Sequence, residues 1–138
     1  MRTGGTLVTR WLTRCAGVAL VAVALTASAS VEPLQPLVAG WEQYFRLSWE
    51  PGERAGRPVV RGRIQNEWGF AATDIRLLVD GFDAAGQLVN QNIGWLGTQL
   101  PPGIYSDFEV PVRAPAASYR VSVFAFSWIQ AGNGGDNR

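Results

Sequence analysis

The stretch VVRGRIQN, residues Val59 to Asn66, carries the clearest folding signal in the chain. Its side chains alternate between a small or apolar set and a polar set, namely Val60, Gly62 and Ile64 against Arg61, Arg63 and Gln65. A two-residue period of this kind is typical of a β-strand with one buried face and one solvated face. We therefore predict a strand here, with the first set facing the core.

The rest of the chain repeats this signal in short segments that are bounded by turn residues. The predicted strands are Trp41 to Trp49, Ile75 to Phe82, Gln87 to Trp95, Ile104 to Val112 and Tyr119 to Ile129. Pro51 to Pro58 is expected to be a loop, and Asp83 to Gly86 a hairpin turn. Beyond residue 30 no convincing helical period is present. The pattern predicts an all-β fold, an antiparallel β-sandwich of six to seven strands after an N-terminal signal helix.

The N-terminus has the layout of a secretory signal peptide. Met1 to Arg14 holds three arginines and no acidic residue, Cys15 to Ala27 is uncharged and apolar, and Ala27-Ser28-Ala29 is a small-residue cleavage pattern. We expect export and cleavage near Ala29, giving a periplasmic or secreted product; the alternative is an uncleaved segment that anchors the chain in a membrane. The expected organisation is a signal peptide at 1–29, an extended lead-in at 30–40, a β-sandwich domain at 41–130 and a flexible tail at 131–138.

Composition excludes most catalytic devices. The 138 residues include 12 arginines but neither lysine nor histidine, and the single cysteine, Cys15, belongs to the leader. Serine–histidine and cysteine–histidine catalysis are therefore impossible, and zinc or copper sites lack their usual ligands. The exported part has no disulfide and a net charge of about −2, because the leader removes three arginines and no acid. We expect no enzyme activity, no cofactor and no metal.

Several short patterns resemble the bacterial FxLYD-type domain, a small immunoglobulin-like sandwich of exported proteins. They are Gly62-x-Ile64-x-Asn66, Ile75-x-Leu77-x-Val79, Phe82-Asp83-x-x-Gly86, Pro102-Gly103, Phe108-x-Val110 and Tyr119-x-Val121-x-Val123, within residues 59–129. The name-giving pattern itself departs, since Val79, Gly81 and Phe82 stand in place of Phe, Leu and Tyr, and only Asp83 matches. The resemblance implies an extracytoplasmic structural or binding module without catalytic residues.

Two charged groups have alternative interpretations. Asp107 and Glu109 share a strand face about 7 Å apart, which overlaps the spacing of glycosidase carboxylates, but they oppose the apolar parity and are expected to be a solvated face. Four arginines, at positions 54, 57, 61 and 63, are expected to protect a sheet edge and to pair with acids of neighbouring strands such as Glu50, Glu53, Asp74 and Asp80. Export and the negative charge argue against nucleic acid.

The aromatic residues are the candidate binding groups. Trp68 and Trp95 stand beside glycines in predicted loops, and Phe124, Phe126 and Trp128 share one parity, opposite Tyr119, Val121 and Val123. Exposed rings of this kind can fill a partner's pocket or stack on sugars. We expect a module for protein–protein interaction in the bacterial cell envelope, with a carbohydrate-binding module as the alternative. In a further interpretation, the segment around Trp41 to Trp49 covers the 124–128 stripe; the sequence leaves this choice and the oligomeric state open.

Overall fold

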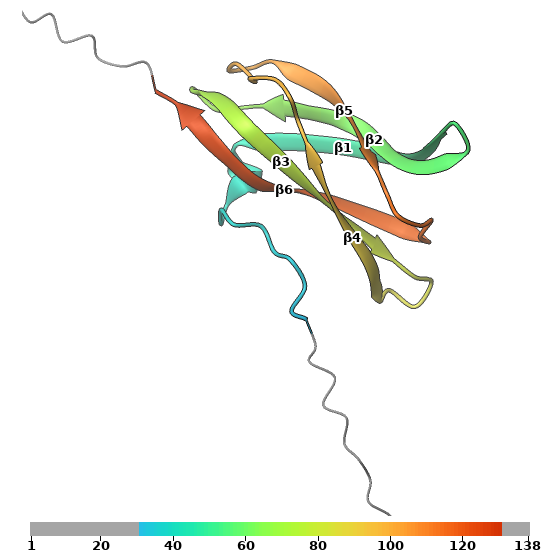
Figure 1. Cartoon of the computed structure of the whole chain (residues 1–138). Coiled ribbons are helices and arrows are strands. Elements are labelled where there is room, and N and C mark those ends of the chain that lie inside the picture. The colour runs from blue at the N-terminus through green and yellow to red at the C-terminus, as the bar shows by residue number, and fades with distance from the viewer. Residues whose placement is uncertain (1–30, 131–138) are drawn as a thin grey trace, which may run out of the picture. The chain divides into compact units, whose positions relative to one another are not determined.

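A computed structural model describes residues 31–130, so the expected signal peptide and C-terminal tail lie outside the described residues. One turn of 3-10 helix precedes six β-strands (Figure 1). In chain order the elements are η1 (Trp41–Gln43), β1 (Phe45–Arg54), β2 (Arg57–Asn66), β3 (Ala71–Phe82), β4 (Leu88–Trp95), β5 (Tyr105–Pro111) and β6 (Ser118–Ile129). Five of the six predicted strands begin and end within a few residues of the observed ones.

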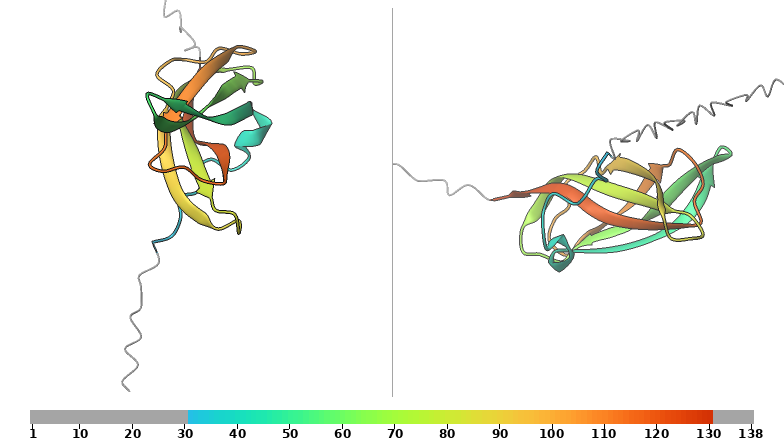
Figure 2. Two further views of the ribbon diagram at one scale, coloured as in Figure 1. Left: turned by 90° about the vertical axis from the view of Figure 1, so that its right-hand side faces the viewer. Right: turned by 90° about the horizontal axis from the view of Figure 1, so that it is seen from below.

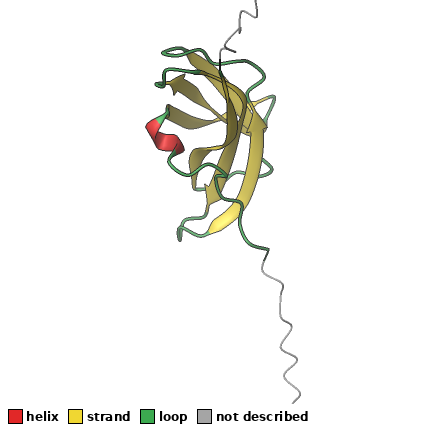
Figure 3. Cartoon of the chain, turned by 90° about the vertical axis from the view of Figure 1, so that its left-hand side faces the viewer, coloured by secondary structure: helices red, strands yellow, loops and turns green. Residues whose placement is uncertain are grey.

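The strands form two antiparallel sheets of three, which confirms the predicted β-sandwich. Sheet A has the order β1-β2-β5 and sheet B the order β4-β3-β6. The two sheets stack as layers with the core between them (Figures 2 and 3). The chain changes sheet between β2 and β3, and again between β4 and β5 and between β5 and β6. Within the described residues, each outer strand therefore has one edge that pairs with no other strand: β1 and β5 in sheet A, and β4 and β6 in sheet B.

The first hairpin is longer than predicted. Pro51 to Pro58 was expected to be a loop, but β1 and β2 pair along their full length up to Arg54 opposite Arg57. Only Ala55 and Gly56 lie between them, both with positive φ (51° and 76°), as a tight two-residue hairpin turn requires. Pro51 does not end the strand, because β1 lies at the edge of its sheet, where proline is tolerated. The first predicted strand was also wrong at its start, since Trp41–Gln43 is the 3-10 turn.

The core is built from the apolar sets that the alternation identified. Val60 and Ile64 of β2 face Ile75, Leu77 and Val79 of β3, and all five are buried. Phe108 and Val110 of β5 and Val121 and Val123 of β6 belong to the same buried cluster, as do Phe45, Ala72, Leu96, Leu100 and Val112. Gly62 is required in this layer, because a Cβ there would meet the Ser48 carbonyl oxygen and lie 2.8 Å from Cζ of Phe108.

Two β-bulges alter the parity of β3 and β6. The register between the strands shifts between Thr73 and Arg76 and again between Arg76 and Leu77, with one extra residue on each strand in turn. Asp74, at φ 52°, occupies the first bulge. Because a bulge resets which side chains face inward, Phe126 and Trp128 pack against the same core as Tyr119, Val121 and Val123. The prediction that these two sets lie on opposite faces is therefore wrong.

Residues 32–40, the N-terminal strap, cross the outer face of sheet B. The strap is fixed to β4 where the Leu34 backbone exchanges two hydrogen bonds with the Gln91 side chain (2.9 and 3.0 Å), and to β6 where the Leu37 N–H donates to the Phe124 carbonyl (2.8 Å). Leu78 and Asp80 face outward by their register, yet they are only 0% and 3% exposed. The strap thus gives part of sheet B a second covered face.

We predict that Gly62→Ala destabilises the fold by about 3 kcal/mol, because the added methyl group must displace β1 backbone and the Phe108 ring. Urea unfolding followed by tryptophan fluorescence measures the effect. Gly69→Ala is the matched control, since a Cβ at Gly69 would have no heavy atom within 4 Å outside its neighbours. Equal unfolding midpoints for the two variants would contradict this packing.

Candidate functional site

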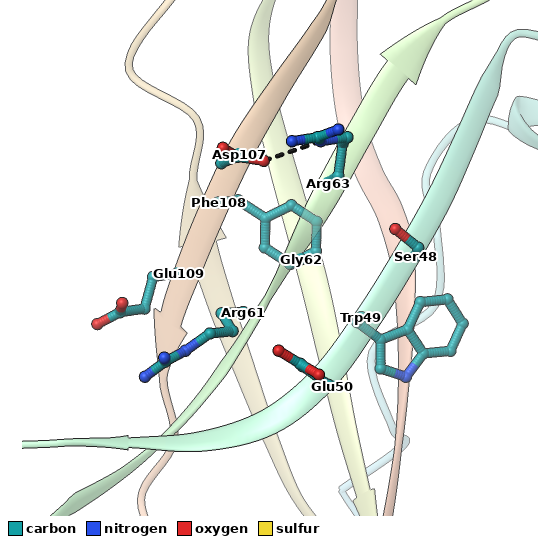
Figure 4. Close-up of a pocket in the computed structure, with 9 residues that line it drawn as sticks. All are labelled: Ser48, Trp49, Glu50, Arg61, Gly62, Arg63, Asp107, Phe108 and Glu109. Carbon is teal, nitrogen blue, oxygen red and sulfur yellow. Dashed lines mark hydrogen bonds and ion pairs between the residues drawn. The ribbon is translucent and has the colours of Figure 1, made fainter.

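The outer face of sheet A carries a lattice of charged side chains around an open groove of about 600 Å³ (Figure 4). Arg63 donates to Asp107 (3.0 Å) and lies over the Tyr105 ring, 3.8 Å from its centroid. Arg54 makes a two-pronged ion pair with Glu109, with Nη2 to Oε2 at 2.7 Å. The acids that pair with these arginines therefore come from β5, not from Glu50, Glu53, Asp74 or Asp80 as predicted.

The ion pairs engage both carboxylates of strand β5 that line the groove. The hydrogen bond from Arg54 lowers the pKa of Glu109 below its ordinary value, although desolvation opposes the shift. Arg61 lies flat over Gly52, where a Cβ would be 2.9 Å from its Nε, and donates to the Glu53 carbonyl (2.8 Å). Both Asp107 and Glu109 are held by guanidinium groups. Within residues 31–130, no three acidic, histidine or cysteine side chains gather as a metal site would require.

Three of the five predicted binding residues belong to one aromatic cluster. Phe126 and Trp128 contact each other edge to face at 5.0 Å, and both contact Tyr44 and Phe45. Trp68 joins the cluster through an edge contact with Tyr44 (4.8 Å between centroids). The segment that precedes and opens β1 thus covers Phe126 and Trp128, which are half-buried, whereas Trp68 is 43% exposed.

Asn66 fixes the loop that presents Trp68. Its side chain is completely buried, and its Nδ2 donates to the carbonyls of Phe70 (2.8 Å) and Leu100 (2.9 Å). Its Oδ1 accepts from the Trp68 N–H (2.9 Å). The Asn66 backbone bonds to Ile104 and Gly103 as well. One amide therefore holds the connection from sheet A to sheet B against the loop that precedes β5.

Trp95 lies outside this cluster, on the outer face of β4 (Leu88–Trp95). It is 66% exposed, and the Arg76 guanidinium of β3 lies 4.8 Å from its ring centroid. Ile93 lies on the same outer face and is 43% exposed. Phe124, the fifth predicted residue, sits in the bulge of β6 and is half-buried, with its carbonyl bonded to the strap. The structure does not bring Trp95 into contact with Trp68.

Ile93 is the residue that sequence reasoning missed. A signal for it is present, since residues 87–106 contain no charged side chain although the strand they include is at a sheet edge. Single exposed apolar residues are common on protein surfaces. A charge-free edge strand that carries Trp95 and Ile93 on one face is less common, and it makes this face the strongest candidate site. We call it the β4 face, meaning Gln91, Ile93, Trp95 and the adjoining Arg76.

Comparison of the chain with models of protein families, with curated proteins and with solved structures finds no match. In the part of the chain that the structure describes, no helix is long and apolar enough to cross a membrane. The choice of the β4 face as the candidate site therefore rests on the exposure and position of its side chains.

We predict that Asn66→Leu lowers the free energy of unfolding by about 4 kcal/mol. Leucine has a similar volume but leaves the Phe70 carbonyl without the Asn66 donor and the Trp68 N–H without its acceptor, whereas the Leu100 carbonyl keeps the Ala72 N–H (3.0 Å). Each unsatisfied buried group costs about 1–3 kcal/mol. Urea unfolding of this variant is compared with Gln99→Leu, which changes an exposed side chain on the neighbouring loop. A loss below about 1 kcal/mol for Asn66→Leu would contradict the role assigned to this amide.

Proposed function

We propose that the protein is an exported, non-enzymatic module that binds a partner protein of the bacterial cell envelope through the β4 face. The observation that carries the proposal is the exposure of Trp95, whose ring is about two-thirds accessible beside the exposed Ile93. Tryptophan is enriched among the residues that dominate binding energy at protein interfaces. The basic and apolar N-terminal pattern supports export, although it lies outside the described residues.

The surroundings of Trp95 suit a preformed contact. The Arg76 guanidinium, on the central strand β3, lies over the Trp95 ring, 4.8 Å from its centroid, and a cation–π contact of this kind favours one ring position before a partner binds. A tryptophan side chain buries about 150–250 Å² at an interface. At about 25 cal/mol per Å² this corresponds to several kcal/mol before the costs of association.

A carbohydrate-binding module remains the second candidate, because Trp95 and Trp68 both present exposed rings. Sugar recognition needs an open ring face with polar groups beside it. On the β4 face the Gln91 side chain is already bonded to the Leu34 backbone and to Asp80, and the Arg76 guanidinium lies over the Trp95 ring itself, 4.8 Å from its centroid. The protein partner is therefore the better supported of the two.

We predict that Trp95→Ala weakens binding to the envelope partner by about 30-fold, the change expected when an interface loses a side chain worth about 2 kcal/mol. The partner is first isolated from envelope extracts with the full chain as bait, and its dissociation constant is then measured with purified components. Tyr105→Ala is the control, because Tyr105 is 53% exposed but lies on sheet A.

Two other outcomes would contradict this prediction, and they differ in which part of the proposal they exclude. Equal affinity of the Trp95→Ala and Tyr105→Ala variants would exclude the β4 face as the contact. If the chain retains no protein but shows a saturable shift of tryptophan fluorescence with envelope polysaccharides, and Trp95→Ala abolishes that shift, the carbohydrate-binding alternative is correct.

A further inference from the structure

The four edge strands of the sandwich are not equally protected against pairing with another chain. An unpaired strand edge is a template for an additional strand, and proteins block such edges with charge, proline or covering segments. β1 contains Arg46, Glu50 and Pro51, and β5 contains Asp107, Glu109 and Pro111. β6 contains Arg120, and two of its carbonyls are already bonded, that of Tyr119 to the Trp49 indole (3.0 Å) and that of Phe124 to the Leu37 N–H (2.8 Å).

Within residues 31–130, β4 has neither charge nor proline in its sequence LVNQNIGW, and no covering segment bonds to its backbone at the open edge. The strap reaches only the side chain of Gln91, not the β4 backbone. A cleft of about 730 Å³ lies between the first half of β4 and the loop at 113–117, and this loop bonds to β4 only through the Asn90 side chain, whose Nδ2 donates to the Ala114 carbonyl (3.4 Å).

The hydrogen-bond pattern identifies which backbone groups of β4 are free. In antiparallel pairs, hydrogen-bonded and non-hydrogen-bonded positions alternate. Leu96 donates to the Ile75 carbonyl (2.9 Å), so these two residues form a hydrogen-bonded pair. In the same register, the next hydrogen-bonded pairs are Gly94 with Leu77 and Asn92 with Val79. The N–H and C=O groups of the intervening residues therefore point away from β3, toward the open edge: Gln91, Ile93 and Trp95.

A second copy of the same strand is complementary to this edge. If two β4 strands run antiparallel about a two-fold axis at Ile93, then Ile93 faces Ile93 of the second copy, and Gln91 faces Trp95. In β3, Arg76 lies opposite Trp95, and Asp80 lies opposite Gln91. With Trp95 of one copy opposite Gln91 of the other, Arg76 of the first copy and Asp80 of the second therefore lie at the two ends of one row across the joined sheets. An axis at Gln91 would align two Asp80 residues, and one at Trp95 would align two Arg76 residues.

We propose that two copies of this chain associate by antiparallel pairing of their β4 strands about a two-fold axis at Ile93, which joins the two B sheets into one continuous six-stranded sheet. Pairing uses the backbone at the strand edge, so the side chains of the β4 face stay on the surface and the inference does not depend on the proposed function. The dimer presents two copies of Trp95 on one face. Because β4 carries no charged residue, a two-fold pair of β4 strands places no like charges opposite each other.

The first test is the oligomeric state of the full chain, measured by sedimentation over a wide range of concentration. We expect a concentration-dependent dimer. Ile93→Lys places two like charges opposite each other at the axis and should raise the dissociation constant by at least about tenfold. Ile104→Lys is the matched control, because Ile104 is 51% exposed outside β4, and it should leave association unchanged.

The second test reads the register directly. In a chain with Cys15→Ser, Ile93→Cys introduces the only thiol. Residues that face each other in a hydrogen-bonded pair have Cα atoms about 5.5 Å apart, within the range of a disulfide. Mild oxidation should therefore give a covalent dimer with Ile93→Cys, and far less with Val89→Cys.

Three results would overturn the proposal. These are a chain that stays monomeric at every concentration, association that Ile93→Lys and Ile104→Lys affect equally, and a chain that dimerises but cross-links no better through Ile93→Cys than through Val89→Cys. A strand of an envelope protein captured on β4 of a monomeric chain would likewise exclude the second copy as occupant. A monomer that still binds its partner through Trp95 would leave the proposed function intact.

Discussion

The central constraint on this fold is that six strands divided into two sheets of three leave two open edges on each sheet. Backbone groups at an open edge must reach water or another donor or acceptor, and they also invite unwanted pairing. Sheet A meets the constraint with charge, since Arg54 and Arg63 pair with Glu109 and Asp107 across it. Sheet B closes one edge with the Trp49 indole and the N-terminal strap. Among the four edges in residues 31–130, the β4 edge carries neither charge nor proline, and no other segment bonds to its free backbone groups.

Buried polar groups set the connections between the sheets. The sequence contains a single cysteine, Cys15, so no disulfide within the chain holds the layers together. Asn66 instead bonds three backbone groups from two loops, and Asp80 is held beneath the strap by Arg120 (2.9 Å) and Gln91 (2.9 Å). Such networks stabilise one specific arrangement, because a partly satisfied network costs more than an apolar core. The Gln91 side chain also fixes the strap on the outer face of sheet B, and the Asn66 side chain fixes the loop that carries Trp68.

The alternation of side chains was sufficient to predict the sandwich and most of its core, because each strand has one buried face. It was not sufficient where the backbone departs from a regular strand. The two-residue turn at Ala55 and Gly56 was hidden inside a stretch rich in glycine, proline and charge, and the bulges of β3 and β6 reversed the expected face of Phe126 and Trp128. Partners such as Glu109 for Arg54 depend on the order of strands in the sheet, which short-range patterns do not contain. Trp95 was predicted as a binding residue from its neighbouring glycines, whereas the contribution of Ile93 required knowledge of the sheet edge.

Residue-resolved hydrogen exchange of the full chain, at a concentration below that of any association, measures whether β4 has a free edge. We expect slow exchange for the N–H groups of Asn90, Asn92 and Gly94, which face β3, and fast exchange for those of Gln91, Ile93 and Trp95, which face the open edge. Uniformly slow exchange along β4 in the dilute chain, or the reverse alternation, would contradict a three-stranded sheet B with an open edge at β4.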